Sequence, residues 1–391
     1  MSQNSMQPNT ETVPVTSPDQ SQSGSSPLPT SSQRVLAIDA LRGFDMFWII
    51  GADTFFVAAL GLSAAPLAKT LSHHLEHVPW EGFVFYDLIF PLFLFIVGCA
   101  IPFSLEKYRS NPSAVWGRIA RRTLLLIAMG LVYNRIQDFQ WSEMRWMGVL
   151  QRIGICYGIA SVLFLKLSPR VLAIVLLAIL LGYWGILAWV PVPGGSAGDL
   201  SPEGNLAGYL DRTLLPGKIY KEYYGFGDNE GILSTIPAVA TAILGIFAGV
   251  WLKSPRNPWL QVLGLAASGA ILLGVGIAWG QVFPIIKNLW TSSFVLVAGG
   301  WSLILLSVFY LLIDVLKWRW WAWFWIIIGS NAITVYMLQD IVPFETIAEY
   351  FLKGTAQLIG DWGPVLLAGG AFSLKWLLLF ALYRHKIFLR L

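Results

Sequence analysis

Long apolar segments, repeated along almost the whole chain, constrain the fold more than any other feature of this sequence. About ten segments have the length of roughly 20 residues that an α-helix needs to cross about 30 Å of hydrocarbon. They lie near residues 36–60, 83–103, 119–137, 147–166, 171–191, 233–252, 259–280, 291–314, 321–343 and 363–383. Only 12% of the residues are charged, against roughly 25% in soluble domains. The sequence therefore predicts an all-α, polytopic integral membrane protein with about ten transmembrane helices.

The first 33 residues differ from the rest of the chain in composition. They consist largely of Ser, Thr, Pro, Gln and Asn with few large apolar residues, so they cannot bury a core. They also lack a basic start followed by an apolar stretch, which is the pattern of a cleavable signal peptide. We expect residues 1–33 to form a disordered tail and residues 34–391 to form a single transmembrane domain.

Basic residues between the segments predict the orientation of the chain. Of the 26 Lys and Arg residues, 16 fall in short connections that would share one side. These 16 are Arg34, Arg42, Lys107, Arg109, Arg118, Arg121, Arg122, Lys166, Arg170, Lys253, Arg256, Lys317, Arg319, Arg384, Lys386 and Arg390. By the positive-inside rule, both termini are cytoplasmic in a multi-pass protein of the plasma or inner membrane. Topology also explains the net charge of +4 better than a nucleic-acid partner does, so the expected partner is the lipid bilayer.

Two long connections, residues 61–82 and 192–232, lie on the opposite, non-cytoplasmic side in this topology. Loops of this length are often functional, although a flexible linker is the simpler interpretation. The second loop combines aromatic rings with carboxylates, a mixture that suits a polar, sugar-like ligand. Its aromatic residues include Tyr209, Tyr220, Tyr223, Tyr224 and Phe226, and its acidic residues include Asp211, Glu222, Asp228 and Glu230.

Acidic residues inside apolar segments need a reason, because each costs about 2.5 to 3.5 kcal/mol on insertion scales. Asp39 and Asp45 lie within one turn of Arg42, so a local ion-pair cluster is the simplest explanation for both. Asp53 lies near the non-cytoplasmic end of the first segment, and Asp87 lies near the same end of the second. Two carboxylates are therefore expected at the outer mouth.

Three of the four His residues fall at the same mouth, at positions 73, 74 and 77. Surface imidazoles that are merely hydrogen-bonded are common, and metal binding by HHxxH is also conceivable. The segment does not form HExxH, and neither Cys99 nor Cys156 adds a ligand motif, so we expect no metal. His77 is distinguished by Asp87 nearby in sequence, because an imidazole beside a carboxylate is suited to proton transfer near neutral pH.

Several longer motifs resemble one known family. The segments RVLAIDALRGFDMFWIIGAD (34–53) and HVPWEGFVFYDLIFPLFLFIVG (77–98) are similar to those of the heparan-α-glucosaminide N-acetyltransferase family and its bacterial relatives. The similarity continues in the same order through GVLQRIG (148–154), VPVPGG (190–195), GYLDRTLLPGKIY (208–220), DNEGILSTI (228–236), KNLWTSSFVL (287–296) and IGSNAITVY (328–336). These motifs span nearly the whole chain after residue 33.

The resemblance implies a membrane acyltransferase that takes acetyl from cytosolic acetyl-CoA, its co-substrate, and delivers it to an amino sugar or related glycan on the far side. His77, Trp80 and Gly82 reproduce the H-x-x-W-x-G context of the family's catalytic His. The family's polar residue in the first span falls on Asp53, and Asp87 completes the candidate catalytic set. His77 could act as acetyl carrier or as general base, and the sequence does not separate the two.

Coenzyme A phosphates require cations, and the sequence contains no P-loop or GxGxxG turn. The candidate cofactor-binding residues are Arg42, Arg122, Arg152 and Asn331, with Arg118, Arg121 and Lys317 as further cations by position. The loop members also serve as topology determinants, whereas Arg152 lies inside a span and requires an anionic or polar partner. Two alternatives stay open: a transporter or lipid-handling protein without chemistry, and an O-acyltransferase of a cell-envelope polysaccharide. A second copy of the chain, in a homodimer, is a further candidate partner.

Overall fold

The computed structural model describes residues 1–2, 35–220 and 225–388. Contacts divide the chain into a unit of Met1–Arg34 and a unit of Val35–Leu391. Apart from the first two residues, the predicted disordered tail lies outside the described part. The second unit is all-α: no β-strand occurs in the described ranges, which contain only isolated bridges between Glu81 and Ile286 and between Arg145 and Gly217.

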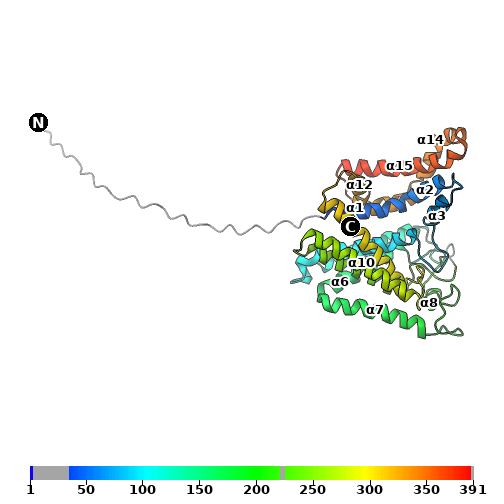
Figure 1. Ribbon diagram of the computed structural model, residues 1–391, viewed down its shortest axis with the longest axis horizontal. Coiled ribbons are helices and arrows are strands. Elements are labelled where there is room, and N and C mark those ends of the chain that lie inside the picture. The colour runs from blue at the N-terminus through cyan, green and yellow to red at the C-terminus, as the bar shows by residue number, and fades with distance from the viewer. Residues whose placement is uncertain (3–34, 221–224, 389–391) are drawn as a thin grey trace. The chain divides into compact units, whose positions relative to one another are not determined.

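Eight helical segments in the described part are long and apolar enough to cross a membrane, which confirms a polytopic membrane protein. They are Leu36–Leu60 (α1, Leu36–Phe47, and α2, Asp53–Leu60), Phe85–Tyr108 (α4, Ile89–Leu105), Val149–Lys166 (α6), Pro169–Trp189 (α7), Thr235–Lys253 (α9), Pro258–Gly280 (α10), Ser292–Val315 (α11, Ser292–Tyr310) and Gly360–Arg384 (α15, Gly363–Arg384). Most of these long helices run along a common direction in Figure 1.

Two of the ten predicted segments take other forms. Residues 321–343 form a broken span, α12 (Ala322–Ser330) and α13 (Ala332–Ile341), which are bent by 66° around Asn331. Residues 119–137 fall largely in α5 (Trp116–Tyr133), an 18-residue helix that carries three arginines in its first two turns. This charge excludes α5 from the eight apolar segments, although it packs against α6 as a full helix.

The centre of the second unit is formed by α4 and α9. About three quarters of the most apolar window of each is buried, 72% and 78%, against 22% in α7, α10 and α15. The two central helices approach so closely that a Cβ added at Gly98 would lie 2.0 Å from the carbonyl oxygen of Ala242. Small residues thus allow the backbones of α4 and α9 to touch, as is common between helices in lipid. The outer helices leave their apolar faces for the bilayer.

The first span is interrupted instead of being one straight helix. A π-helical segment, Trp48–Ala52, separates α1 from α2, and Gly51 within it has φ +113°, which favours glycine. Before this break in the chain, Arg42 and Asp39 form an ion pair at 3.5 Å. The predicted cluster is wrong for Asp45, which is fully buried and has no hydrogen-bond partner among the described residues.

Short motifs fix where several helices begin. Ser168, Asn205, Asn257 and Thr291 each precede a helix and accept a hydrogen bond from a backbone N–H of its first turn. Pro follows directly in α7 and α10, where its missing N–H costs nothing. The Asn205 cap starts α8 (Leu206–Leu214), which lies within the long loop of residues 192–232.

Connections at one end of the helices contact one another, and these are the predicted cytoplasmic ones. Lys253, which ends α9, donates to the carbonyl oxygen of Pro102 in α4 at 3.1 Å, and Arg109 donates to the carbonyl oxygens of Phe164 and Leu167 at the end of α6. The other end carries α3 (Pro66–His73), α8 and α14 (Phe344–Leu358), which Figure 1 places together away from the start of α1. The two predicted long loops therefore meet at one end.

Candidate functional site

A cavity of about 600 Å³ opens at the end where the two long loops meet. Its size lies within the range of about 300 to 1,000 Å³ that is typical of ligand sites. Its walls combine His77, aromatic rings and charged side chains from segments far apart in sequence. The aromatic lining includes Tyr86, Tyr133, Tyr220 and Tyr336, and the charged lining includes Glu143, Arg145, Lys218, Glu230 and Lys287. Tyr133 of α5 and Tyr336 of α13 stack with their ring centroids 4.9 Å apart.

His77 is positioned by a loop that folds back between α3 and α4. The backbone N–H of Tyr86 donates to the carbonyl oxygen of His74 at 3.1 Å, which brings residue 87 next to residue 77. His77 Nδ1 lies 2.7 Å from Asp87 Oδ1. The second oxygen of Asp87 accepts from the backbone N–H of Val84 at 3.2 Å, which fixes the carboxylate. The structure thus brings His77 and Asp87, which are near each other in sequence, into direct contact.

Gly82 lets this loop approach the connection between α10 and α11. Its φ is +122°, a conformation that L side chains rarely adopt. The N–H of Gly82 donates to the carbonyl oxygen of Ile285 at 2.9 Å, and Glu81 forms a β-bridge with Ile286. The indole N–H of Trp80 donates to the carbonyl oxygen of Leu200 at 2.9 Å, which attaches the loop to the second long connection. The H-x-x-W-x-G motif therefore holds three loops together.

Asp53 reaches His77 through one intermediate residue. The hydroxyl of Tyr86 donates to Asp53 Oδ2 at 2.9 Å, and the Tyr86 ring lies against the imidazole with centroids 4.7 Å apart. The structure thus brings the three predicted catalytic residues, His77, Asp53 and Asp87, into one connected group. His77 and Asp87 contact each other directly, whereas Asp53 contacts Tyr86, whose ring lies against His77.

Lys287 is a site residue that the candidate catalytic set misses. Its Nζ lies 2.8 Å from Nδ1 and 3.0 Å from Nε2 of His77, and 3.4 Å from Asp87 Oδ1. The residue is 210 positions away in sequence, so no local pattern connects it to His77. The available signal is the motif KNLWTSSFVL, in which a lysine lies in the short connection between two apolar segments, at the same predicted end as His77.

The imidazole of His77 is biased toward its neutral form. Burial lowers the pKa of His77, and the charge of Lys287 lowers it further, while the hydrogen bond and charge of Asp87 and the charge of Glu230 raise it. Burial also lowers the pKa of Lys287, against the opposing effect of Asp87 and Glu230. A neutral imidazole that donates its Nδ1–H to Asp87 presents a lone pair at Nε2. This state suits a nucleophile or a general base.

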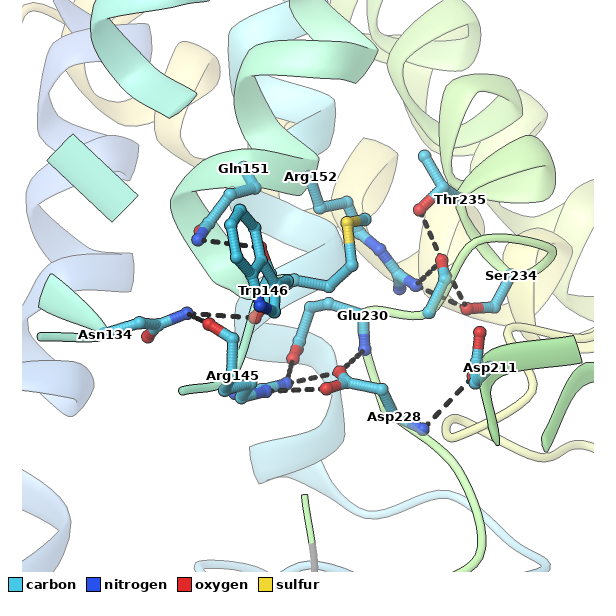
Figure 2. Close-up of polar contacts among 12 residues, drawn as sticks. Asn134, Arg145, Trp146, Gln151, Arg152, Asp211, Asp228, Glu230, Ser234 and Thr235 are labelled. Atoms are coloured by element: carbon cyan, nitrogen blue, oxygen red, sulfur yellow. Dashed lines mark hydrogen bonds and ion pairs between the residues drawn. The ribbon is translucent and has the colours of Figure 1, made fainter. Parts of the chain in front are cut away.

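A second polar network forms the wall beside the cavity, and Figure 2 shows its members. Arg145 donates to both oxygens of Asp228, with Nε at 2.7 Å and Nη2 at 2.5 Å, and it also pairs with Glu230. These carboxylates raise the pKa of Arg145 even though burial opposes its charge. The Tyr220 ring lies 4.2 Å from the guanidinium. The network fixes Glu230 at the cavity wall.

Asp211 of α8 organises the backbone of this wall. Its carboxylate accepts from the N–H groups of Asp228 at 3.1 Å and Ile232 at 2.9 Å, and burial raises its pKa to about 6. The prediction that residues 192–232 contribute to a polar site is supported at Tyr220 and Glu230, which line the cavity. Glu222, Tyr223 and Tyr224 lie outside the described residues.

A family model described as the catalytic domain of heparan-alpha-glucosaminide N-acetyltransferase matches residues 34–273, which is more than half of the chain. This chain belongs to that family. The matched region contains His77, Asp53, Asp87 and the Arg145 network, whereas Lys287 lies beyond it.

Two curated proteins named heparan-alpha-glucosaminide N-acetyltransferase are similar to this family member. The human protein is 28% identical over 373 residues, covering 81% of this chain and 55% of the human protein. The mouse protein is 28% identical over 333 residues, covering 70% of this chain and 50% of the mouse protein. The chain thus spans about half the length of the curated relatives it matches. The family predicted from the motifs is confirmed.

The four predicted cofactor-binding residues of this family member do not line the cavity. Arg42 lies on α1 beside Asp39, and the guanidinium of Arg122 lies 4.5 Å from the Tyr157 ring between α5 and α6. Asn331 is buried at the break between α12 and α13 and donates to the carbonyl oxygen of Ile387 at 3.0 Å. Their assignment to coenzyme A stays a prediction.

Arg152 lies behind the Arg145 network, near the start of α6 and fully buried. It donates to the hydroxyl of Ser234 and to the carbonyl oxygen of Gly231 at 3.3 Å (Figure 2), and it lies 4.9 Å from the Trp290 ring. The expected polar partner of this span residue is therefore found. In the described ranges, no group of three His, Cys, Asp or Glu side chains is arranged to hold a metal ion.

Proposed function

We propose that this chain is a membrane acyltransferase that moves an acetyl group from cytosolic acetyl-CoA to an amino sugar or related glycan on the non-cytoplasmic side. The observation that carries the proposal is the 2.7 Å contact between His77 Nδ1 and Asp87 in the wall of the cavity. Family membership supports the reaction class. The position of the cavity, at the end opposite the basic connections, supports transfer toward the outer face.

His77 performs the chemistry in this proposal, in one of two ways. As a carrier, its Nε2 attacks the thioester carbonyl, and the amine later takes the acetyl group from the imidazole. As a base, Nε2 removes the proton of the amine while both substrates are bound. Asp87 holds the Nδ1–H in either case, which leaves the lone pair on Nε2.

The lining of the cavity supports an amino sugar as acceptor. Glu143 and Glu230 are suited to an ammonium group, and the stacked rings of Tyr133 and Tyr336 suit the faces of a sugar. Arg42 and Arg122 lie toward the end where cytosolic coenzyme A would enter, and we assign its phosphates to these cations, with Arg152 and Asn331 as further candidates. Acetyl transfer to a cell-envelope polysaccharide hydroxyl is the second acceptor class to be compared.

Substitution of His77 tests the proposal. Acetyl transfer from acetyl-CoA to glucosamine is measured in proteoliposomes for the wild type, His77→Ala, His73→Ala and His74→Ala. His73 and His74 are exposed neighbours and serve as matched controls. We expect His77→Ala to reduce the rate of acetyl transfer by about 10²-fold to 10⁴-fold, the range of general acid–base catalysis, or by more if His77 carries the acetyl group. The two control variants should keep a rate near that of the wild type.

Binding of coenzyme A separates loss of chemistry from loss of fold. A ligand that binds only the native state raises the apparent unfolding temperature, so coenzyme A should stabilise His77→Ala and the wild type alike. Full activity of His77→Ala would refute the histidine mechanism. Acetylated His77, trapped from labelled acetyl-CoA without acceptor and located by mass spectrometry, would establish the carrier route.

A further inference from the structure

The backbone around Lys287 is fixed by hydrogen bonds, and its side chain reaches both nitrogens of His77. The segment before it is bridged to residues 81–82, and Thr291 accepts the N–H of Ile286 at 3.1 Å. The carbonyl oxygen of Lys287 accepts from the N–H of Trp290 at 2.9 Å. The side chain of Lys287 is only 12% exposed. Its ammonium group is therefore placed by a fixed turn and not by a mobile loop.

Of its two contacts at the catalytic pair, Lys287 lies nearer to the imidazole of His77 than to the carboxylate of Asp87. Nζ lies 2.8 and 3.0 Å from the two nitrogens of His77 but 3.4 Å from Asp87 Oδ1. A lysine whose purpose is to neutralise Asp87 would be expected to lie closest to that oxygen. Asp87 instead provides the counter-charge that keeps an ammonium group in this buried place. Because Nζ lies 3.0 Å from Nε2, a carbonyl oxygen two bonds from that nitrogen would be within reach of its N–H donors.

We propose that Lys287 is a catalytic residue of the acyl transfer, which donates a hydrogen bond to the acyl carbonyl oxygen while that oxygen carries negative charge at His77. This inference rests on the function proposed above, in its carrier form. It adds an oxyanion donor to the candidate set of His77, Asp53 and Asp87. Donors that are fixed before the reaction contribute strongly in a site that excludes water.

The lone pair of His77 Nε2 forms a bond to the thioester carbon, and the carbonyl π pair moves to the oxygen, which accepts an N–H of Lys287. The electron pair on the oxygen then re-forms the carbonyl double bond, the C–S bond breaks, and coenzyme A leaves as thiolate. The amine then attacks the carbonyl carbon of acetyl-His77, which forms a second oxyanion that accepts a hydrogen bond from the same lysine. The C–N bond to the imidazole breaks. Nε2 then takes the proton of the amine and passes it to the thiolate.

Lys287 is not itself the acetyl carrier in this scheme. An acetyl group on its amine would form an ordinary amide, which does not transfer to a sugar amine. An acetyl group on the imidazole stays activated, because neutral imidazole is a good leaving group once the tetrahedral intermediate forms. The two side chains therefore have separate roles, with the nucleophile at His77 and the electrostatic stabilisation at Lys287.

The pH profile of acetyl transfer tests this role. Lys287→Met is compared with the wild type and with Lys69→Met, which makes the same change at an exposed position of α3. Loss of an oxyanion donor typically lowers kcat by about 10²-fold to 10³-fold, so we expect the high-pH plateau of Lys287→Met to fall by that factor. The acid limb should also move to higher pH, because the cation that lowers the pKa of His77 is gone. Lys69→Met should match the wild type.

The rate at the high-pH plateau distinguishes a catalytic role of Lys287 from an effect on the pKa of His77 alone. If Lys287 only kept His77 neutral, Lys287→Met would shift the acid limb and regain the wild-type rate at high pH. That result overturns the proposal. Stabilisation by coenzyme A reports whether Lys287→Met is folded. If Lys287→Met does not fold, Lys287→Gln replaces it, because glutamine keeps polar atoms at the buried position.

A second measurement does not depend on acetyl-CoA being the donor. Diethyl pyrocarbonate acylates neutral imidazole through the same kind of tetrahedral intermediate, and mass spectrometry can follow its product on His77 over a range of pH. The limiting rate at high pH should be lower in Lys287→Met or Lys287→Gln than in the wild type, and an unchanged limiting rate counts against Lys287. A wild type that reacts normally here but transfers no acetyl group would contradict the proposed function instead.

Discussion

Asp87 and Lys287 act on the same imidazole in opposite directions, and this opposition can be measured. The hydrogen bond and charge of Asp87 raise the pKa of His77, whereas Lys287 lowers it. Burial has the largest effect and lowers the pKa of His77 below its usual value. Since the neutral form reacts, activity should rise with pH through the pKa of His77 and level off above it.

Asp87→Asn tests the role of the carboxylate. The acid limb of acetyl transfer should move to lower pH, because an influence that raises the pKa of His77 is removed. The plateau should fall by about 10²-fold or more, since an amide can donate to Nδ1 and thereby place the remaining proton on Nε2. The measurement is kcat/KM against pH in proteoliposomes. An acid limb that moves to higher pH would contradict the assigned interaction.

At the residue scale, sequence reasoning identified contacts that are short in the chain and missed those that are long. Ten positions separate His77 from Asp87, and this closeness in sequence made Asp87 the carboxylate to associate with His77. Lys287 reaches the same imidazole from 210 positions away, across a β-bridge between two irregular loops. Periodicity carries no information about such a bridge, because neither loop has a regular repeat.

At the element scale, the contact between α4 and α9 depends on glycine. A Cβ added at Gly245 would lie 2.0 Å from the carbonyl oxygen of Phe95, a backbone atom that cannot move aside cheaply. Close backbone approach of this kind compensates for the absence of a hydrophobic driving force between helices in lipid. The two most buried helices would have to separate to admit even one methyl group.

Gly245→Ala should therefore lower the free energy of unfolding in detergent by about 1 to 3 kcal/mol, the usual cost of overpacking. Gly274→Ala in α10 is the matched control, because a Cβ there meets nothing within 4 Å. Alanine is the better helix former by about 1 kcal/mol, so the control should be neutral or slightly stabilising. Equal effects of the two changes on the unfolding temperature would show that α4 and α9 are not packed this closely.

The elements themselves were predicted well where apolar length decides and less well where it does not. Segments such as 171–191 and 259–280 are found as α7 and α10 nearly as expected, because about 20 apolar residues leave few alternatives. The break at Gly51 and the bend at Asn331 were not predicted. Both occur inside continuous apolar runs, where hydropathy does not register a change in backbone direction.

At the scale of the whole molecule, the polar candidate site and the exposed apolar surface of the outer helices occupy different places. The Arg145 network and the group around His77 lie at the end formed by the long loops, whereas α7, α10 and α15 expose large apolar side chains along their length. The distribution of Lys and Arg predicted which connections share an end, and contacts such as Lys253 with Pro102 agree with it. Which end faces the cytoplasm is a separate question that charge alone predicts.

Reporter fusions answer that question and with it the direction of transfer. A reporter fused after Leu391 should be cytoplasmic, because the final basic residues belong to the side that holds 16 of the 26 Lys and Arg residues. A reporter inserted after Gly195, in an exposed part of the loop between α7 and α8, should lie on the other side. Retained stabilisation by coenzyme A would show that each fusion is folded. The reverse pattern would place His77 on the cytoplasmic side, where acetyl-CoA could reach it without any transfer across the membrane. The acceptor of the acetyl group would then have to be a cytosolic molecule.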